Sequence, residues 1–315
     1  MTARRILVIK LGALGDFVQA LGPFAAIRRY HADDHITLLT TRLYAPLGKA
    51  CGYFDDIWID DRPPLWRAVL WLMLKQRLDA GGFERIYDLQ TSRRTGRYFR
   101  MLRRPKPEWN GIAPGCSHPH LNSDRGSMHS IDRLQEQLRA AGIAKLMPLD
   151  FSWINGEVSA FGLETGFVLL APGGSAHRLI KRWPQDGYVA LAQSLAEQGR
   201  QPVLIGTGDE TACNTAITDA CPQAVNLTGR TTIVDVARLA RAAAGAVGND
   251  SGPMHLIAAV GCPSLVLFSA ASDPARCAQR GPLVSILQRD DLSNLNLYEV
   301  EASIRLRYGK TLESR

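Results

Sequence analysis

Residues 6–16 read ILVIKLGALGD. The four branched aliphatic residues at the start of this stretch have the length of a buried strand and are too few for the apolar core of a secretory signal. Gly12 and Gly15 follow where the chain must turn sharply, and Asp16 stands at or near the N-cap of a helix expected over 16–30. The stretch therefore predicts a strand, a tight turn and a helix.

The same alternation continues along the chain. Strand-like runs are expected at 36–40, 57–59, 85–89, 167–171, 202–205, near 225, 245–247 and 264–268, with helical patterns between them. A looser region, 105–127, and a helix over 130–141 separate the two halves. Such alternation predicts parallel sheets with helices on both faces. We expect domains at 1–150 and 151–290 and a C-terminal segment at 291–315.

Composition narrows the class of protein. At 315 residues and 46% hydrophobic, the chain can bury two cores, and its six scattered cysteines contain no C-x-x-C pair. The longest apolar stretch, 65–74, is interrupted by Arg67 and is about half the roughly 20 residues that cross a bilayer. These features predict a cytoplasmic protein. The helical spacing of Trp66, Leu70 and Met73 is typical of a core-facing side.

Ligands of open parallel sheets bind beyond the carboxyl ends of the strands, which singles out three loops. The first is 10–16. The second contains Gly173 and Ser175, with Lys181 six residues further on, and the third runs over 248–255. In the third, Asp250, Ser251 and Gly252 lead into Pro253 at the first helical position, which leaves backbone N–H groups free to bind phosphate. An ordinary capped helix and a surface lysine are the alternative interpretations.

These loops predict the binding of a diphosphate without metal. Lys181 would neutralise a leaving diphosphate beside the helix terminus. Glu210 would accept hydrogen bonds from ribose hydroxyls, although Asp209 could serve instead or only cap the helix. The chain has no D-x-D motif to hold Mg²⁺ or Mn²⁺, and G-x-x-G lacks the spacing of the dinucleotide fingerprint. We expect no metal and no cofactor.

Positive charge is concentrated in one segment. The chain carries a net charge of +7, and residues 93–106 hold seven cations and no acid. Arg93, Arg97, Arg100 and Arg104 are spaced to share one helix face. A solvated face is the ordinary meaning of such a run, and nucleic acid, a membrane surface or a phosphorylated substrate would each suit it. Its place after the strand at 85–89 favours an anionic acceptor.

Taken together, the motifs at 6–10 with Gly15 and Asp16, at 172–173 with 181–184, and at 249–255 resemble those of the bacterial heptosyltransferases of glycosyltransferase family 9. The resemblance spans nearly the whole chain. It implies an α/β GT-B fold, with two facing Rossmann-like doubly wound parallel-sheet domains and a C-terminal segment that packs back on the first. It also implies an ADP-heptose donor, an anionic lipopolysaccharide inner-core acceptor, and contact with the cytoplasmic face of the inner membrane, with no nucleic-acid partner.

Carried over residue by residue, the resemblance makes Asp16 the catalytic base and Lys181 the lysine that binds and stabilises the departing phosphate. One direct displacement would invert the anomeric centre, because no second carboxylate is assigned as a nucleophile. Ser251 stands where many relatives have threonine. The donor set is Gly173, Ser175, Lys181, Glu210, Asp250, Ser251 and Gly252, and the acceptor set is Gly12, Gly15, Arg93, Arg97 and Arg100.

Three alternatives stay open at this point. The chain could be a family 9 transferase of another nucleotide-sugar. It could be a GT-B-type nucleotide-sugar epimerase, which would turn over donor without acceptor. It could also be a non-catalytic protein that binds nucleotide-sugar or lipopolysaccharide, although the presence of Asp16 disfavours this.

Overall fold

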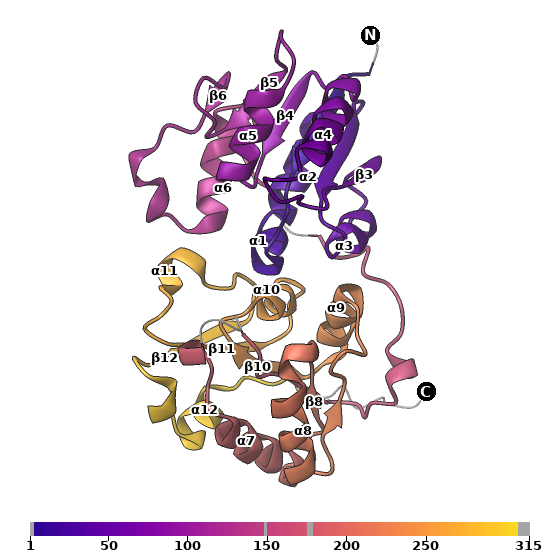
Figure 1. Cartoon of the computed structure of the whole chain (residues 1–315). Coiled ribbons are helices and arrows are strands. Elements are labelled where there is room, and N and C mark those ends of the chain that lie inside the picture. The colour runs from indigo at the N-terminus through magenta and orange to yellow at the C-terminus, as the bar shows by residue number, and fades with distance from the viewer. Residues whose placement is uncertain (1–2, 148–149, 175–178, 308–315) are drawn as a thin grey trace. The chain divides into compact units, whose positions relative to one another are not determined.

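The computed structural model describes residues 3–147, 150–174 and 179–307. The chain divides into two compact units, Met1–Trp153 and Ile154–Arg315, close to the boundary expected after residue 150. Each unit contains one six-stranded parallel sheet with helices around it (Figure 1). The α/β class expected from the alternating sequence pattern is therefore confirmed.

The first sheet has the strand order β3-β2-β1-β4-β5-β6, and all its neighbouring strands are parallel. Its strands are β1 (Arg5–Ile9), β2 (His35–Thr40), β3 (Asp56–Ile59), β4 (Arg85–Asp88), β5 (Glu108–Gly111) and β6 (His118–Pro119). Its helices are α1 (Leu14–Gln19), α2 (Leu21–Tyr30), α3 (Ala45–Ala50), α4 (Ala68–Ala80), α5 (Arg93–Met101) and α6 (Ser130–Arg139).

The second sheet has the order β12-β11-β10-β7-β8-β9, again parallel throughout. Its strands are β7 (Val168–Ala171), β8 (Pro202–Leu204), β9 (Val225–Asn226), β10 (Gly245–Asn249), β11 (Ser264–Phe268) and β12 (Val284–Gln288). Its helices are α7 (Gln185–Glu197), α8 (Thr211–Ala220), α9 (Ile233–Ala242), α10 (Gly252–Ala259), α11 (Pro274–Cys277) and α12 (Leu297–Ser303). Numbered within each unit, both sheets follow the doubly wound order 3-2-1-4-5-6.

Both faces of the second sheet are buried, because successive strand side chains point to opposite faces. Val168 and Leu170 of β7 belong to one core cluster, which contains residues of α7, α8 and α12. Leu169 and Ala171 belong to the other, which contains residues of α9 and α10. Strands buried on both faces read as continuous apolar runs, which explains why the sequence reveals them so clearly.

Several expected boundaries differ in the structure. The helix expected over 16–30 is two helices, α1 and α2, separated at Ala20. The looser region 105–127 contributes β5 and β6 to the edge of the first sheet, and β12 was not expected. These strands are short or only partly buried, so their apolar pattern is weak.

The C-terminal segment is part of the second unit as far as residue 307. Leu292, Leu295 and Val300 lie in the core cluster that contains α7, and the Trp183 indole donates a 2.9 Å hydrogen bond to the carbonyl of Leu295. The Arg307 N–H donates to Ala244 at 2.8 Å. The apolar side chains of residues 291–307 therefore complete the second core. That this segment packs back on the first domain stays a prediction. Residues 308–315 lie outside the described residues.

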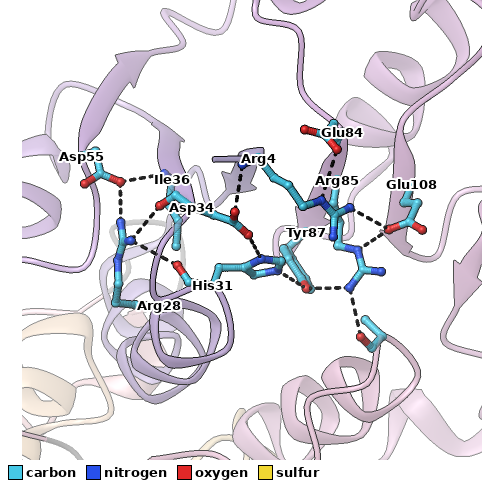
Figure 2. A network of polar contacts seen from close by, with 11 residues as sticks. Arg4, Arg28, His31, Asp34, Ile36, Asp55, Glu84, Arg85, Tyr87 and Glu108 are labelled. Carbon is cyan, nitrogen blue, oxygen red and sulfur yellow. Dashed lines mark hydrogen bonds and ion pairs between the residues drawn. The ribbon is translucent and has the colours of Figure 1, made fainter. Parts of the chain in front are cut away.

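A polar network lies at the amino-terminal ends of the strands of the first sheet, the edge opposite the ligand edge (Figure 2). The imidazole of His31 bonds to the Asp34 carboxylate at 2.7 Å and to the Tyr87 hydroxyl at 2.9 Å. Asp34 also accepts a 2.9 Å bond from the backbone N–H of Arg4. Nearby, Arg85 is paired with Glu108. Each of these polar groups has a partner inside the unit, so the network is structural.

We expect this network to make the protein less stable in acid. Burial raises the pKa of Asp34, but hydrogen bonds from His31 and Arg4 outweigh burial and hold this pKa below its ordinary value of 3.8. Burial lowers the pKa of His31 below 6.5. A depressed folded-state pKa stabilises the fold above the unfolded-state pKa, and that stability is lost as pH falls through the folded-state value. The His31 contribution therefore declines below about pH 6.5, and that of Asp34 below about pH 4.

Urea unfolding of the wild type and of Asp34→Asn at pH 7, 5 and 3.5 measures how the stability of the fold depends on pH. The wild-type midpoint should fall on acidification, and Asp34→Asn should start lower at pH 7 and lose less between pH 5 and 3.5. Equal losses in the two proteins over that interval would contradict the assignment.

Candidate functional site

The candidate residues cluster at the strand pair where each sheet reverses its order. These pairs are β1 and β4 in the first unit and β7 and β10 in the second. Ile9 lies opposite Asp88, and Ala171 lies opposite Gly248, so the loops after each pair leave the sheet side by side. Ligands of doubly wound sheets bind at this switch point. The structure therefore brings the first loop to one switch point and the second and third loops to the other.

In the second unit, Lys181 and Asp250 form an ion pair. The Lys181 Nζ lies 2.8 Å from Asp250 Oδ2, and their side chains are 13% and 8% exposed. The Ser272 hydroxyl donates to Oδ2 at 2.7 Å, and the Gln279 amide donates to Oδ1 at 3.1 Å. Burial opposes ionisation, but these three donors hold the pKa of Asp250 below its ordinary value. A lysine ammonium has three N–H groups, so Lys181 can hold Asp250 and still donate to a ligand.

The N-terminus of α10 lies directly after this pair. Ser251 is the N-cap, and no side-chain hydrogen bond caps the helix. Its hydroxyl oxygen is buried and has no hydrogen-bond partner among the described residues. Gly252 is the first helical residue and Pro253 the second, one position later than expected for the proline. An uncapped helix terminus with an unused hydroxyl has the donors that bind an anion.

Asn249 joins the two loops of this site, a role that its place in the motif alone did not predict. The side chain is fully buried. Its Nδ2 donates to the Pro172 carbonyl at 2.6 Å and to the Gly173 carbonyl at 3.3 Å, while its Oδ1 accepts from the Trp183 N–H at 2.9 Å. A buried amide that satisfies three backbone groups of neighbouring loops fixes their positions. Asn249 therefore positions the loop that carries Lys181.

Glu210 has a local structural role that the sequence did not decide. Its Oε2 accepts 2.8 Å bonds from the N–H and the hydroxyl of Thr207, which closes a capping box before α8. Its Oε1 lies 3.8 Å from Arg182 Nη2. A Cβ on Gly173 would lie 2.7 Å from this Oε1, so a larger residue there would displace the Glu210 side chain. Oε1 therefore lies beside the second loop, at Gly173. Ser175, the other residue expected there, lies outside the described residues.

In the first unit, Gly12 makes the turn that presents Asp16. Gly12 has φ +119°, and a Cβ there would lie 2.3 Å from the Tyr44 ring. Asp16 is the third residue of α1, whose N-cap is Ala13, so the expectation of a capping Asp16 is corrected. Gly15 is buried within the same helix. Burial lowers the pKa of the neighbouring Lys10, and the negative charge of Asp16 opposes this shift.

Lys10, the neighbour of Asp16, belongs to a cluster of three cations that was not expected from the sequence: Lys10, Arg125 and Arg133. Lys10 is 5% exposed, and its Nζ donates to the Leu89 carbonyl at 3.0 Å. Burial, and repulsion by Arg133 and Arg125, lower the pKa of Lys10, while Asp16 opposes the shift. Burial, and to a smaller extent repulsion by Arg133, lower the pKa of Arg125 to about 10. Arg125 and Arg133 come from the region expected to be loose and from α6, so only the fold reveals the cluster.

The basic face of α5 agrees with the expected helix. Arg93 and Arg100 are exposed and Arg97 is half-buried. Arg94 lies on another face of α5 and has a structural role. Its guanidinium donates to the Pro63 carbonyl at 3.2 Å and lies over the Trp71 ring. Among the described residues, no group of three His, Cys, Asp or Glu side chains is arranged to hold a metal ion.

Comparisons with known proteins place this geometry in a family. Residues 133–297 match the model of "Glycosyltransferase family 9 (heptosyltransferase)". Lipooligosaccharide heptosyltransferase 2 of Haemophilus influenzae is 35% identical over 97 residues, which are 29% of this chain and 28% of that protein. Lipopolysaccharide heptosyltransferase 2 of Salmonella typhimurium is 31% identical over 163 residues, 48% of this chain and 44% of that protein. The matches thus span less than half of these curated relatives.

A solved structure, E. coli heptosyltransferase WaaC with ADP, superposes with a TM-score of 0.78 at 16% identity. The superposition covers 95% of this chain and 98% of that one. At this identity the likeness concerns the fold, and it extends over both units.

Proposed function

Because the chain belongs to glycosyltransferase family 9, the heptosyltransferase family, we propose that it transfers a heptose from ADP-heptose to an anionic acceptor in the lipopolysaccharide inner core. The observation that carries this proposal is the Lys181–Asp250 pair beside the uncapped N-terminus of α10. This arrangement suits the diphosphate of a nucleotide-sugar, because it offers an ammonium, a helix dipole and backbone N–H groups together.

On the donor side, we assign the diphosphate to Lys181, Ser251 and Gly252. Asp250 holds Lys181 in place through their 2.8 Å contact. Gly173 and Glu210 would lie nearer the nucleoside, where Glu210 Oε1 is available to a ribose hydroxyl. Charge on the departing ADP is met by a preorganised cation and helix terminus, which makes a divalent metal unnecessary.

On the acceptor side, we assign proton removal to Asp16. As the acceptor hydroxyl loses its proton to the Asp16 carboxylate, its oxygen bonds to the anomeric carbon, and the bond from that carbon to the diphosphate oxygen breaks with its electrons going to ADP. This single displacement inverts the anomeric centre. Lys10, Arg125 and Arg133, together with Arg93, Arg97 and Arg100, supply positive charge for an anionic acceptor, and Gly12 and Gly15 let it approach the backbone.

We place the reaction at the cytoplasmic face of the inner membrane, with the protein as a peripheral partner of the bilayer. This follows from an acceptor that is anchored in lipid. Among the described residues, no helix is long and apolar enough to cross a membrane.

The proposal is tested by release of ADP. With ADP-heptose and a lipopolysaccharide-core acceptor, ADP should form only when both are present, and EDTA should leave the rate unchanged. Loss of activity in EDTA that Mg²⁺ restores would overturn the metal-independent mechanism. Conversion of the donor alone into an isomeric nucleotide-sugar, with no acceptor present and no net release of ADP, would favour an epimerase.

A further inference from the structure

An apolar surface lies on the first unit, outside the candidate site. Only Leu74 and Leu78 of α4 are buried. Trp66, Val69 and Met73 are 82%, 70% and 57% exposed, so the expectation that Trp66, Leu70 and Met73 face the core is wrong. The helix is apolar nearly all round, and its spacing alone does not reveal which side is buried. We call the set of exposed residues the α4 surface: Leu65, Trp66, Val69, Leu70, Leu72 and Met73.

The fold holds this surface in place. The Arg94 guanidinium and the Trp71 indole each donate a 3.2 Å bond, to the carbonyls of Pro63 and Pro64 respectively. The buried Asp60 accepts from the Tyr98 hydroxyl and, at 2.7 Å, from the N–H of Arg62. The segment before α4 is therefore anchored to α5. The backbone that carries these apolar side chains is held by hydrogen bonds, and the side chains are nevertheless exposed. An exposed apolar patch of this extent marks a binding surface.

Exposed positive charge lies on the same segment as the α4 surface and on the neighbouring helix α5. Arg62 and Arg67 are exposed within the same segment, and the exposed Arg93 and Arg100 lie on α5. The two helices are in contact, since the rings of Trp71 and Tyr98 are 5.7 Å apart.

The aspartates near the α4 surface are paired with cationic side chains of the same unit. Asp61 is paired with Arg42, and Asp79 is paired with Lys75. Asp60 is buried and lies 3.6 Å from Arg94. The charge left around the apolar residues is therefore positive, which complements an anionic surface.

The surface begins at the ligand edge of the sheet. The segment that carries Leu65 and Trp66 follows the carboxyl end of β3, and α5 follows the carboxyl end of β4. These are the same ends of the strands from which the loop of Gly12 and Asp16 emerges. A substrate anchored in lipid could thus reach this edge from a bilayer at the α4 surface.

We propose that the α4 surface docks on an anionic lipid bilayer. Tryptophan, leucine and methionine enter the headgroup boundary, and the flanking arginines bind the anionic headgroups. A second copy of this chain is disfavoured as the occupant, because a two-fold contact would place the arginines of one copy against those of the other. The inference rests on the proposed function only in that the acceptor is carried by a membrane.

Vesicle co-sedimentation without any sugar donor tests the proposal. The full chain should bind vesicles of phosphatidylglycerol and phosphatidylethanolamine, bind phosphatidylcholine vesicles less, and dissociate as salt rises. Trp66→Gln with Met73→Gln should weaken binding at least about tenfold, because two large apolar side chains lose their burial. The matched control is Tyr298→Gln, which removes a side chain 78% exposed on α12 in the other unit and should bind as the wild type does.

Transfer of the sugar to a soluble, deacylated acceptor is measured in parallel with vesicle binding. Normal transfer by the double variant, with vesicle binding lost, supports docking by the α4 surface. Unchanged vesicle binding, or a dimer in sedimentation that the double variant dissociates, overturns it. If the wild type binds vesicles but shows no transfer, the proposed function is contradicted and the proposal of a docking surface is not.

Discussion

Asp16→Asn is expected to lower turnover by about 10² to 10⁴, the usual effect of removing a general base. Asparagine keeps the size and much of the hydrogen bonding of aspartate, but it does not accept a proton at neutral pH. Because Asp16 is assigned to the acceptor, donor affinity should change little. Turnover at saturating donor, beside ADP binding by calorimetry, separates the two effects.

The matched control for this variant is Asp33→Asn, which changes an exposed carboxylate in the turn after α2, away from the ligand edge. It should transfer normally, and circular dichroism should show both variants folded. If Asp16→Asn loses donor binding but transfers normally at saturating donor, Asp16 is a structural residue of α1 and the proposed base is wrong.

Lys181→Ala is expected to fail differently, losing both donor affinity and turnover. A hydrogen bond to a charged group is worth roughly 1.5–3 kcal/mol, which predicts ADP binding about 10- to 100-fold weaker. Turnover should fall further, because the ammonium meets more charge as the diphosphate departs than it does in the bound donor. Calorimetry with ADP and steady-state kinetics measure the two losses.

The variant also leaves the buried Asp250 without its cation, so stability must be followed separately. Thermal unfolding should show a lower midpoint for Lys181→Ala, with retained secondary structure at the assay temperature. Lys145→Ala, at an exposed lysine of the first unit, is the matched control and should alter neither binding nor turnover. ADP affinity unchanged in a folded Lys181→Ala would place the diphosphate elsewhere.

The sequence predicted most of the fold because parallel strands buried on both faces are continuous apolar runs. The runs at Ile6–Ile9 and Val168–Ala171 stand out for this reason. β12 was missed because none of its residues is fully buried and its pattern is mixed. The helix at 65–78 was identified, but its orientation was wrong, since the exposed side of an apolar helix depends on its neighbours.

The candidate site was predictable where it is local and not where it depends on the fold. The loop from Asp250 to Gly252 has its chemistry in consecutive residues. In contrast, the pairing of Lys181 with Asp250 joins residues 69 apart in the chain, and the cluster of Lys10 with Arg125 needs the first sheet and α6 in place. The bond from Asn249 to the Pro172 carbonyl is likewise set by the adjacency of β7 and β10.

If this chain moves a sugar to an acceptor, the mass of the acceptor must increase by that sugar. A lipopolysaccharide-core acceptor is incubated with the protein and ADP-heptose and analysed by mass spectrometry, with ADP measured in parallel. The acceptor should gain one heptosyl residue for each ADP released, and Asp16→Asn should show little gain in mass and little ADP. An acceptor of unchanged mass, whether the donor is consumed or only bound, would contradict the proposed transfer.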